Sequence, residues 1–210
     1  MSNQTVNKEK KFIGVKDLIL GVLLGLLSYV LASIPMLFLQ PLGLEAASIL
    51  SVAIAALISG TIYVLIIRKS PRIGSCFVFT IPFAIVYLIM GTVAAPILLL
   101  IAGIVGELSM LSGGYESKWR GVIPFCLFWL AFSFGSLSSM IFMPEASIQT
   151  FISAGMEETA ARAMLDATIA IYTAPTYVIL QIVAAIGGSV IGYFIGTKVL
   201  HKRFKGAGVA

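Results

Sequence analysis

Six long apolar runs, separated by short polar connections, are the feature that most constrains this chain. A run of about 20 apolar residues is long enough to cross the hydrocarbon core of a bilayer as a helix. The runs cover residues 18–39, 46–67, 74–90, 93–111, 122–143 and 172–199. Of the 210 residues, 59% are hydrophobic and 11% are charged, against about 45–50% and about 25% in soluble domains. The pattern excludes a soluble or disordered chain and predicts an all-α membrane protein, a six-transmembrane-helix bundle in which residues 1–210 form a single domain.

The basic residues mark the ends of these runs. Every Lys and Arg except Arg162 lies in one of four segments, at residues 1–16, 68–73, 112–120 and 198–205. Short basic segments stay on the cytoplasmic side of a membrane. The distribution therefore predicts a multi-pass protein of the cell membrane with both termini in the cytoplasm, where residues 200–210 form the tail. It also explains the net charge of +5 without a nucleic-acid partner.

One connection, residues 144–171, is much longer than the others and falls on the predicted outer side. It holds four carboxylates, and its small apolar residues recur at helical spacing at Ala160, Ala163, Met164 and Ala167. This pattern predicts a short amphipathic helix over residues 156–168, lying on the membrane surface. An external lid over a binding site and a passive interfacial helix both fit.

The chain lacks the residue sets of the common intramembrane enzymes. His201 is its single histidine, which excludes a His-Glu-x-x-His zinc site and a Ser–His protease. No aspartate pair lies within the runs, and no Gly-rich nucleotide-binding motif occurs. We therefore expect no catalytic residues, no metal site and no cofactor on this chain. Cys76 and Cys126 lie in separate runs and are expected to be packing thiols.

Glu107 is a carboxylate within an apolar run, about one turn before a polar connection. An ionisable group at membrane depth suggests a functional site. Its closeness to the connection favours a structural role, in which it reaches the interface or pairs with Lys118 or Arg120. A proton relay would need a second ionisable group within the membrane, and the sequence offers none.

Small residues recur every three or four positions in the first and last runs. They are Gly21, Gly25, Ser28 and Ala32 in the first, and Ala184, Gly188, Gly192 and Gly196 in the last. Such stripes let the backbones of two helices approach closely within a membrane. A contact inside the bundle and a groove for a partner protein are both consistent with them.

Uncharged aromatic and amide side chains lie in the predicted outer halves of the runs. The candidates for substrate binding are Tyr29, Gln40, Tyr87, Trp129, Tyr177 and Gln181, with Tyr172 and Thr176 nearby. Such a mixture suits a small, flat ligand with polar and aromatic character. Tyr172 and Tyr177 have an alternative role as anchors at the membrane interface.

Three short motifs carry a family resemblance. They are Lys16-Asp17-Leu18-Ile19-Leu20-Gly21, the turn Gly113-Gly114-Tyr115-Glu116-Ser117-Lys118-Trp119, and an ending from Ile191-Gly192 to Lys198 followed by Lys202-Arg203-Phe204-Lys205. With the six-run pattern, they make the chain similar to the S components of energy-coupling factor (ECF) transporters, and most similar to the MptS or Trep/Strep subfamily. The resemblance spans nearly the whole chain.

The resemblance implies a membrane-embedded subunit that captures a vitamin or related micronutrient from outside. Such subunits bind a transmembrane coupling subunit (EcfT-like) that carries two ATPase subunits, so ATP would act on partner chains. Family members use small residues of the first helix at this interface. The matching positions here are Gly21 and Gly25, which stand where the family often has alanine, followed by Ser28 and Ala32.

The resemblance also implies a binding site on the outer side, roofed here by residues 40–45, 91–92 and 144–171. It identifies no substrate and no substrate-binding residue. Two other functions stay open from the sequence. An autonomous carrier or channel would move a solute without partners. A membrane enzyme would need a catalytic set within the membrane, and an assembly scaffold would tolerate loss of Trp129 and Gln181 with no binding phenotype.

Overall fold

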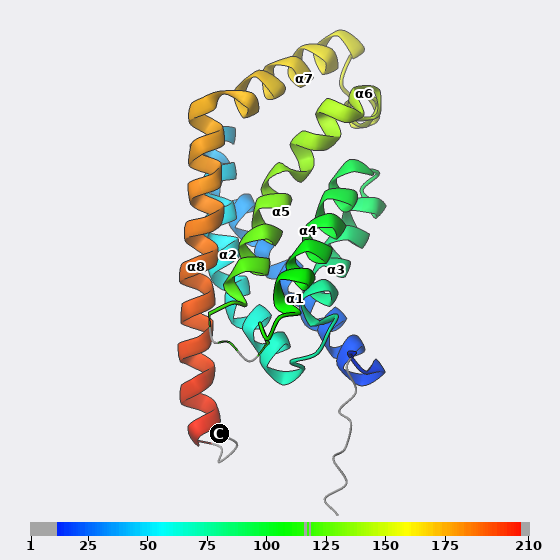
Figure 1. The fold of residues 1–210 in the computed structure, drawn as a ribbon. Helices are drawn as coiled ribbons and strands as arrows, with labels where there is room; N and C mark the ends of the chain where they lie inside the picture. The colour runs from blue at the N-terminus through cyan, green and yellow to red at the C-terminus, as the bar shows by residue number, and fades with distance from the viewer. Residues whose placement is uncertain (1–11, 116, 118, 207–210) are drawn as a thin grey trace, which may run out of the picture.

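The computed structural model describes residues 12–115, 117 and 119–206, and it confirms the all-α prediction for them (Figure 1). The elements are α1 (Val15–Leu39), the short 3-10 helix η1 (Gln40–Leu42), α2 (Leu44–Lys69), α3 (Ser75–Ile89), α4 (Ala94–Met110), α5 (Val122–Phe142), α6 (Pro144–Ser153), α7 (Glu158–Thr173) and α8 (Pro175–Gly206). Each predicted apolar run is helical, although the run at 172–199 begins in the last residues of α7 and is interrupted at Ala174 before α8. Residues 1–11 and 207–210 of the predicted terminal segments lie outside the described residues.

The helices differ in their capacity to cross a membrane. Among the described residues, three helices are long and apolar enough by length and composition, and they are α1, α2 and α8. The apolar helices α3 and α4 have 15 and 17 residues, which gives lengths of about 22 and 26 Å at 1.5 Å per residue. A typical hydrocarbon core is about 30 Å thick. The protein is therefore a helical membrane protein with three clear candidate spans, and the count of six stays a prediction.

The closest helix pair is formed by α2 and α8, which lie side by side along much of their length (Figure 1). A Cβ atom added to Gly192 would lie 2.5 Å from the carbonyl oxygen of Ala56, and one added to Gly188 would lie 2.5 Å from that of Ala53. Gly196 meets Gly60 in the same way. The small-residue stripe of the last run is thus a contact within the bundle, at which the absence of side chains brings two backbones together.

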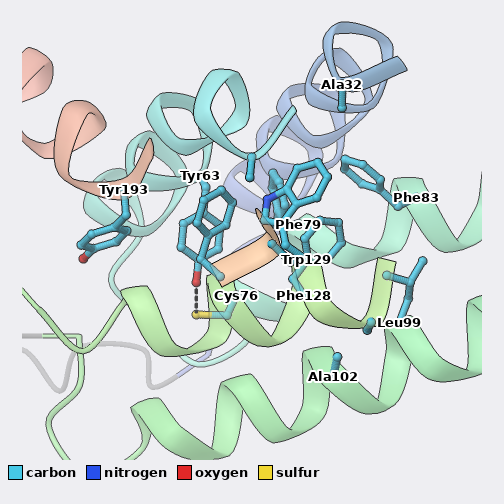
Figure 2. Close-up of a cluster of buried hydrophobic side chains, with 14 of the residues drawn as sticks. Ala32, Tyr63, Cys76, Phe79, Phe83, Leu99, Ala102, Phe128, Trp129 and Tyr193 are labelled. Atoms are coloured by element: carbon cyan, nitrogen blue, oxygen red, sulfur yellow. Dashed lines mark hydrogen bonds between the residues drawn. The ribbon is translucent and has the colours of Figure 1, made fainter. Parts of the chain in front are cut away.

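A cluster of aromatic rings fills the space between α2, α3 and α5. Trp129 is completely buried and lies edge-on against Phe128 and Phe132, with ring centroids 5.4 and 5.0 Å apart. Tyr63 stacks on Phe125 at 4.5 Å. Figure 2 shows Tyr63, Trp129 and several phenylalanines of this cluster together. Because edge-to-face pairs are favourable beyond their buried area, this cluster holds the three helices in fixed positions.

Glu107 has a structural role at the start of α3, and Arg120 is not its partner. Its carboxylate accepts hydrogen bonds from the backbone N–H groups of Gly74 at 2.7 Å, Cys76 at 3.1 Å and Phe77 at 3.2 Å, at the first turn of α3. These are the donors that a helix leaves unpaired at its start, where negative charge is stabilised. Of the expected partners, Lys118 lies outside the described residues, and Arg120 binds Ser112 instead.

The hydroxyl of Tyr115, in the connection between α4 and α5, also donates to Glu107. Burial, the neighbouring Cys76 thiol and this hydrogen bond raise the pKa of Tyr115, so its hydroxyl stays protonated and available as a donor. Cys76 also accepts from Tyr63 at 3.6 Å (Figure 2). The packing role expected for this thiol therefore includes weak hydrogen bonds.

The long connection before α8 forms two helices rather than the single one predicted. The helices α6 and α7 pack on each other around Ile148, Ala161 and Leu165, which are buried. Arg162 binds Glu145 and Glu158 at 3.2 and 3.0 Å. Its pKa is raised by the hydrogen bonds to Glu145 and Glu158.

The face of α7 that packs against the protein is not the face formed by the predicted small apolar residues. The expected apolar residues Ala160, Ala163, Met164 and Ala167 are exposed, and the buried face lies one position further along. The reason is the presence of α6, which the sequence pattern did not reveal. Because α6 packs against the side of α7 that carries Ala161 and Leu165, these two residues are the buried ones.

The packing of α2 on α8 predicts that Gly192→Ala lowers stability. The new methyl group would meet backbone atoms, which cannot move aside as a side chain can, so the free energy of unfolding should fall by about 1–3 kcal/mol. Thermal unfolding in a neutral detergent measures this. Gly187→Ala on the same helix is the control, since its Cβ would meet nothing within 4 Å. Equal melting temperatures for the two variants would contradict the close approach.

The role of Glu107 predicts a second loss of stability. Glu107→Ala removes the acceptor for three backbone N–H groups, and we expect a loss of about 2 kcal/mol because hydrogen bonds to charged groups are strong. Glu107→Gln keeps one acceptor oxygen and should fall between this variant and the parent. The check is the midpoint of unfolding in detergent. A stability of Glu107→Ala equal to that of the parent would show that the N-terminus of α3 does not depend on this carboxylate.

Candidate functional site

A cavity of about 450 Å³ opens between α1, α2, α3, α5, α7 and α8. Its position is near the start of α2 and of α8 and the end of α1, at the end of the bundle where α7 crosses to α8 (Figure 1). All the residues around it are uncharged. They are Ala32, Ser33, Met36, Leu37, Ser48, Ser51, Val52, Ala55, Tyr87, Phe132, Ser133, Tyr172, Tyr177 and Gln181.

The junction of α7 and α8 places two tyrosine rings on the cavity wall. Ala174 has an extended backbone, with ψ at 131°, because the ring of the following Pro175 disfavours the helical conformation there. The chain changes direction at this residue, and the rings of Tyr172 and Tyr177 stack with centroids 4.7 Å apart. The hydroxyl groups of Tyr177 and Ser48 lie 2.9 Å apart, which joins α8 to α2 across the cavity.

Gln181 lies one turn below Tyr177 and is 2% exposed. Its side-chain oxygen Oε1 is buried and has no hydrogen-bond partner. A buried acceptor without a partner costs about 1–3 kcal/mol, and such groups are few in folded proteins. The position of this oxygen in a cavity wall makes it the strongest candidate for a contact with a bound molecule.

The hydroxyl groups of the serines in the cavity wall donate hydrogen bonds to backbone carbonyls of their own helices. Ser51 donates to the carbonyl of Ser48 at 3.0 Å, and Ser133 donates to that of Trp129 at 2.6 Å. Ser33 donates within α1 in the same manner. The hydroxyl oxygens of these serines can still accept hydrogen bonds through their lone pairs. Together with Gln181, the wall therefore suits a neutral ligand that carries N–H or O–H donors and a flat ring.

The structure brings three of the six predicted substrate residues together. Tyr87, Tyr177 and Gln181 line the cavity, and so does Tyr172. The other three do not. Tyr29 packs edge-on against Phe83, Gln40 is exposed in η1, and Trp129 is buried in the aromatic cluster behind Phe132.

The sequence interpretation missed the small polar residues of the wall. Ser48 and Ser51 are three positions apart on α2, so they lie on one face of that helix. Phe132 and Ser133 reach the cavity from α5. A polar face on an otherwise apolar helix was the available signal, but the prediction gave weight to large aromatic residues.

The small-residue stripe of α1 lies inside the bundle. A Cβ atom at Gly21 would be 2.6 Å from Val78, and one at Gly25 would be 2.9 Å from Pro82, both on α3. Ser28 and Ala32 are buried as well, and Ala32 lines the cavity. In this conformation α3 covers the stripe that was assigned to a partner, so a bulky substitution there would disturb the bundle itself.

Within the described part of the chain, no group of three or more His, Cys, Asp or Glu side chains could hold a metal ion. The polar and aromatic residues that line the cavity supply hydroxyl, amide and aromatic groups.

The unpaired oxygen of Gln181 generates a prediction for the ligand-free protein. Gln181→Met keeps a similar shape and removes the unpaired acceptor, so its melting temperature should equal or exceed that of the parent. Gln40→Met is the matched control at an exposed position outside the cavity. A clear fall in the melting temperature of Gln181→Met alone would mean that this amide holds the bundle together, which would weaken its assignment to ligand binding.

Comparison with known proteins gives a family for the chain. Neither the curated proteins nor the solved structures include a match. Residues 15–205 match the family model described as Trep_Strep, a hypothetical bacterial integral membrane protein. The match includes every helix from α1 to α7 and nearly all of α8. The chain therefore belongs to the Trep_Strep family of bacterial integral membrane proteins.

Proposed function

We propose that this protein is the high-affinity substrate-binding subunit of an ECF-type, ATP-driven importer. The observation that carries the proposal is the uncharged cavity with the unpaired oxygen of Gln181 in its wall. A volume of about 450 Å³ is within the range of small-molecule sites. Membership of the Trep_Strep family and the resemblance to S components support a transport role.

The proposed substrate is a small neutral molecule with a flat ring, such as a vitamin or a heteroaromatic precursor. The stacked rings of Tyr172 and Tyr177 offer an aromatic face, and Gln181 offers an acceptor for a ring N–H or a hydroxyl group. A charged ligand would find no countercharge among the lining residues, and its desolvation would then be costly.

The proposed topology has six crossings, with both termini in the cytoplasm of the cell and the cavity open to the outside. The start of α1 and the end of α8 lie at the same end of the bundle (Figure 1), as an even number of crossings requires. The basic connections at residues 68–73 and 112–120 lie between helices that return to that end. The helices α6 and α7 would then lie on the outer side as a lid.

The energy for transport would come from partner chains. We assign ATP binding and hydrolysis to two ATPase subunits, joined to this protein by an EcfT-like coupling subunit. The chain has no nucleotide-binding motif of its own, in keeping with a non-enzymatic role. The surface that meets the coupling subunit would have to differ from the covered stripe at Gly21 and Gly25, or else become free through a movement of α3.

Mass spectrometry of small molecules released from the purified, detergent-solubilised protein tests the proposal. We expect one ring-containing compound at a stoichiometric amount, and its loss by tenfold or more in Gln181→Met, because a buried hydrogen bond to the ligand contributes about 1.5 kcal/mol. Gln40→Met should retain the compound. An autonomous carrier is the alternative, and movement of that compound into liposomes that contain this chain alone would favour it over the proposed subunit.

A further inference from the structure

A second hollow lies at the opposite end of the bundle from the candidate cavity. It has a volume of about 330 Å³ and is formed by the ends of α2 and α8 and by the connection that precedes α5. The side chains that matter for its chemistry are Arg68, Trp119, Phe194, Thr197, Lys198 and His201. None of these was a candidate for substrate binding, and the proposed function does not use them.

The hollow gathers basic groups without a carboxylate among its lining residues. Arg68 from α2 and Lys198 and His201 from α8 all line it. The ion pairs formed among the described residues use Arg72 and Arg162 instead. Arg68 has a hydrogen bond with the hydroxyl of Tyr193, which carries no negative charge to balance it. Glu116 and Lys118, in the adjacent connection, lie outside the described residues. The charge of the hollow is complementary to an anion.

The walls of the hollow are apolar and aromatic. Trp119 is 65% exposed, and its ring lies edge-on against Phe194 with centroids 4.7 Å apart. Val64 and Leu200 complete the wall. Ile191 and Ile195 lie seven and three positions before Lys198 on α8, on the same face of the helix, and each exposes more than two fifths of its surface. An apolar track therefore leads from the basic groups toward the start of α8. An exposed tryptophan beside cations and an apolar track is the arrangement found where a protein meets the headgroup layer of a membrane.

We propose that this hollow binds the headgroup phosphate of an anionic phospholipid. The guanidinium of Arg68 and the ammonium of Lys198 would contact the phosphate, and His201 would add an N–H donor. Thr197 donates to the carbonyl of Phe194 at 2.8 Å, so its proton is already in use. The glycerol region would lie against Trp119, and an acyl chain would follow Ile195 and Ile191 along α8. A free phosphate ion would make no contact with this apolar track, whereas the acyl chain of a lipid would.

The test is a lipid titration of the full chain in a neutral detergent, followed by native mass spectrometry. The probes are dioleoyl-phosphatidylglycerol and dioleoyl-phosphatidylcholine, which share acyl chains and differ in net charge. We expect a preference for phosphatidylglycerol in the parent. The variant Arg68→Gln/Lys198→Gln should bind this lipid about 25-fold more weakly, on a scale of about fivefold for each basic side chain.

The control is Lys69→Gln/Lys202→Gln, which removes two positive charges from the same two helices. Neither residue lines the hollow, and both are exposed. We expect this variant to bind phosphatidylglycerol as the parent does. Thermal unfolding in detergent shows whether each double variant folds. If Arg68→Gln/Lys198→Gln does not fold, the single variants Arg68→Gln and Lys198→Gln are measured in its place.

Three results would overturn the proposal. Equal binding of the two lipids by the parent would remove the anionic requirement. An equal loss in the control would show a general effect of net charge. Displacement of phosphatidylglycerol by millimolar inorganic phosphate at unchanged ionic strength would indicate a site for the free ion rather than for a lipid. All three leave the proposed substrate cavity untouched, since they concern the opposite end of the bundle.

Discussion

The close contact between α2 and α8 is the interaction on which the rest of the structure depends. Glycines on α8 meet the backbone of α2 at Ala53, Ala56 and Gly60, and such a short distance is available only where no side chain intervenes. The two helices also line the candidate cavity, through Ser48 on α2 and Gln181 on α8. Their separation at the glycines therefore sets the position of both residues.

Unpaired polar groups are costly in a lipid environment, so the partners of each buried polar group matter for this bundle. Glu107 is an example, because it lies within an apolar helix yet meets three backbone donors of α3. Gln181 is the contrast, because its oxygen is buried without a partner in the wall of the cavity. Other described residues also have an unpaired buried polar atom, namely Ser28, Ser59, Ser70 and Trp129, but they do not line the cavity. We interpret Glu107 as part of the architecture and Gln181 as part of the binding function.

The two ends of the bundle have different chemistry. The candidate cavity is uncharged and is approached by α7, whose direction relative to α8 is set by the extended Ala174 before Pro175. The other end carries the basic hollow around Arg68 and Lys198. A neutral pocket at one end and a basic hollow at the other agree with the two proposals, in which a ligand binds from one side while the opposite end lies at an anionic membrane surface.

The sequence by itself determined the long apolar helices and the all-α class, but not α6. A long apolar run favours transfer into lipid, and a basic cluster is excluded from it. Both effects depend on residues that are close in the sequence, so the apolar runs and their ends could be predicted without a structure. The structure decided which faces meet. Gly21 and Gly192 carry the same signal, and only the packing shows that α3 covers the first and α2 the second. Gln40 and Gln181 are equally polar, and only the tertiary structure exposes one and buries the other. The physical reason is that a helix fixes the spacing of its own side chains, whereas its rotation against its neighbours depends on contacts between residues far apart in the chain.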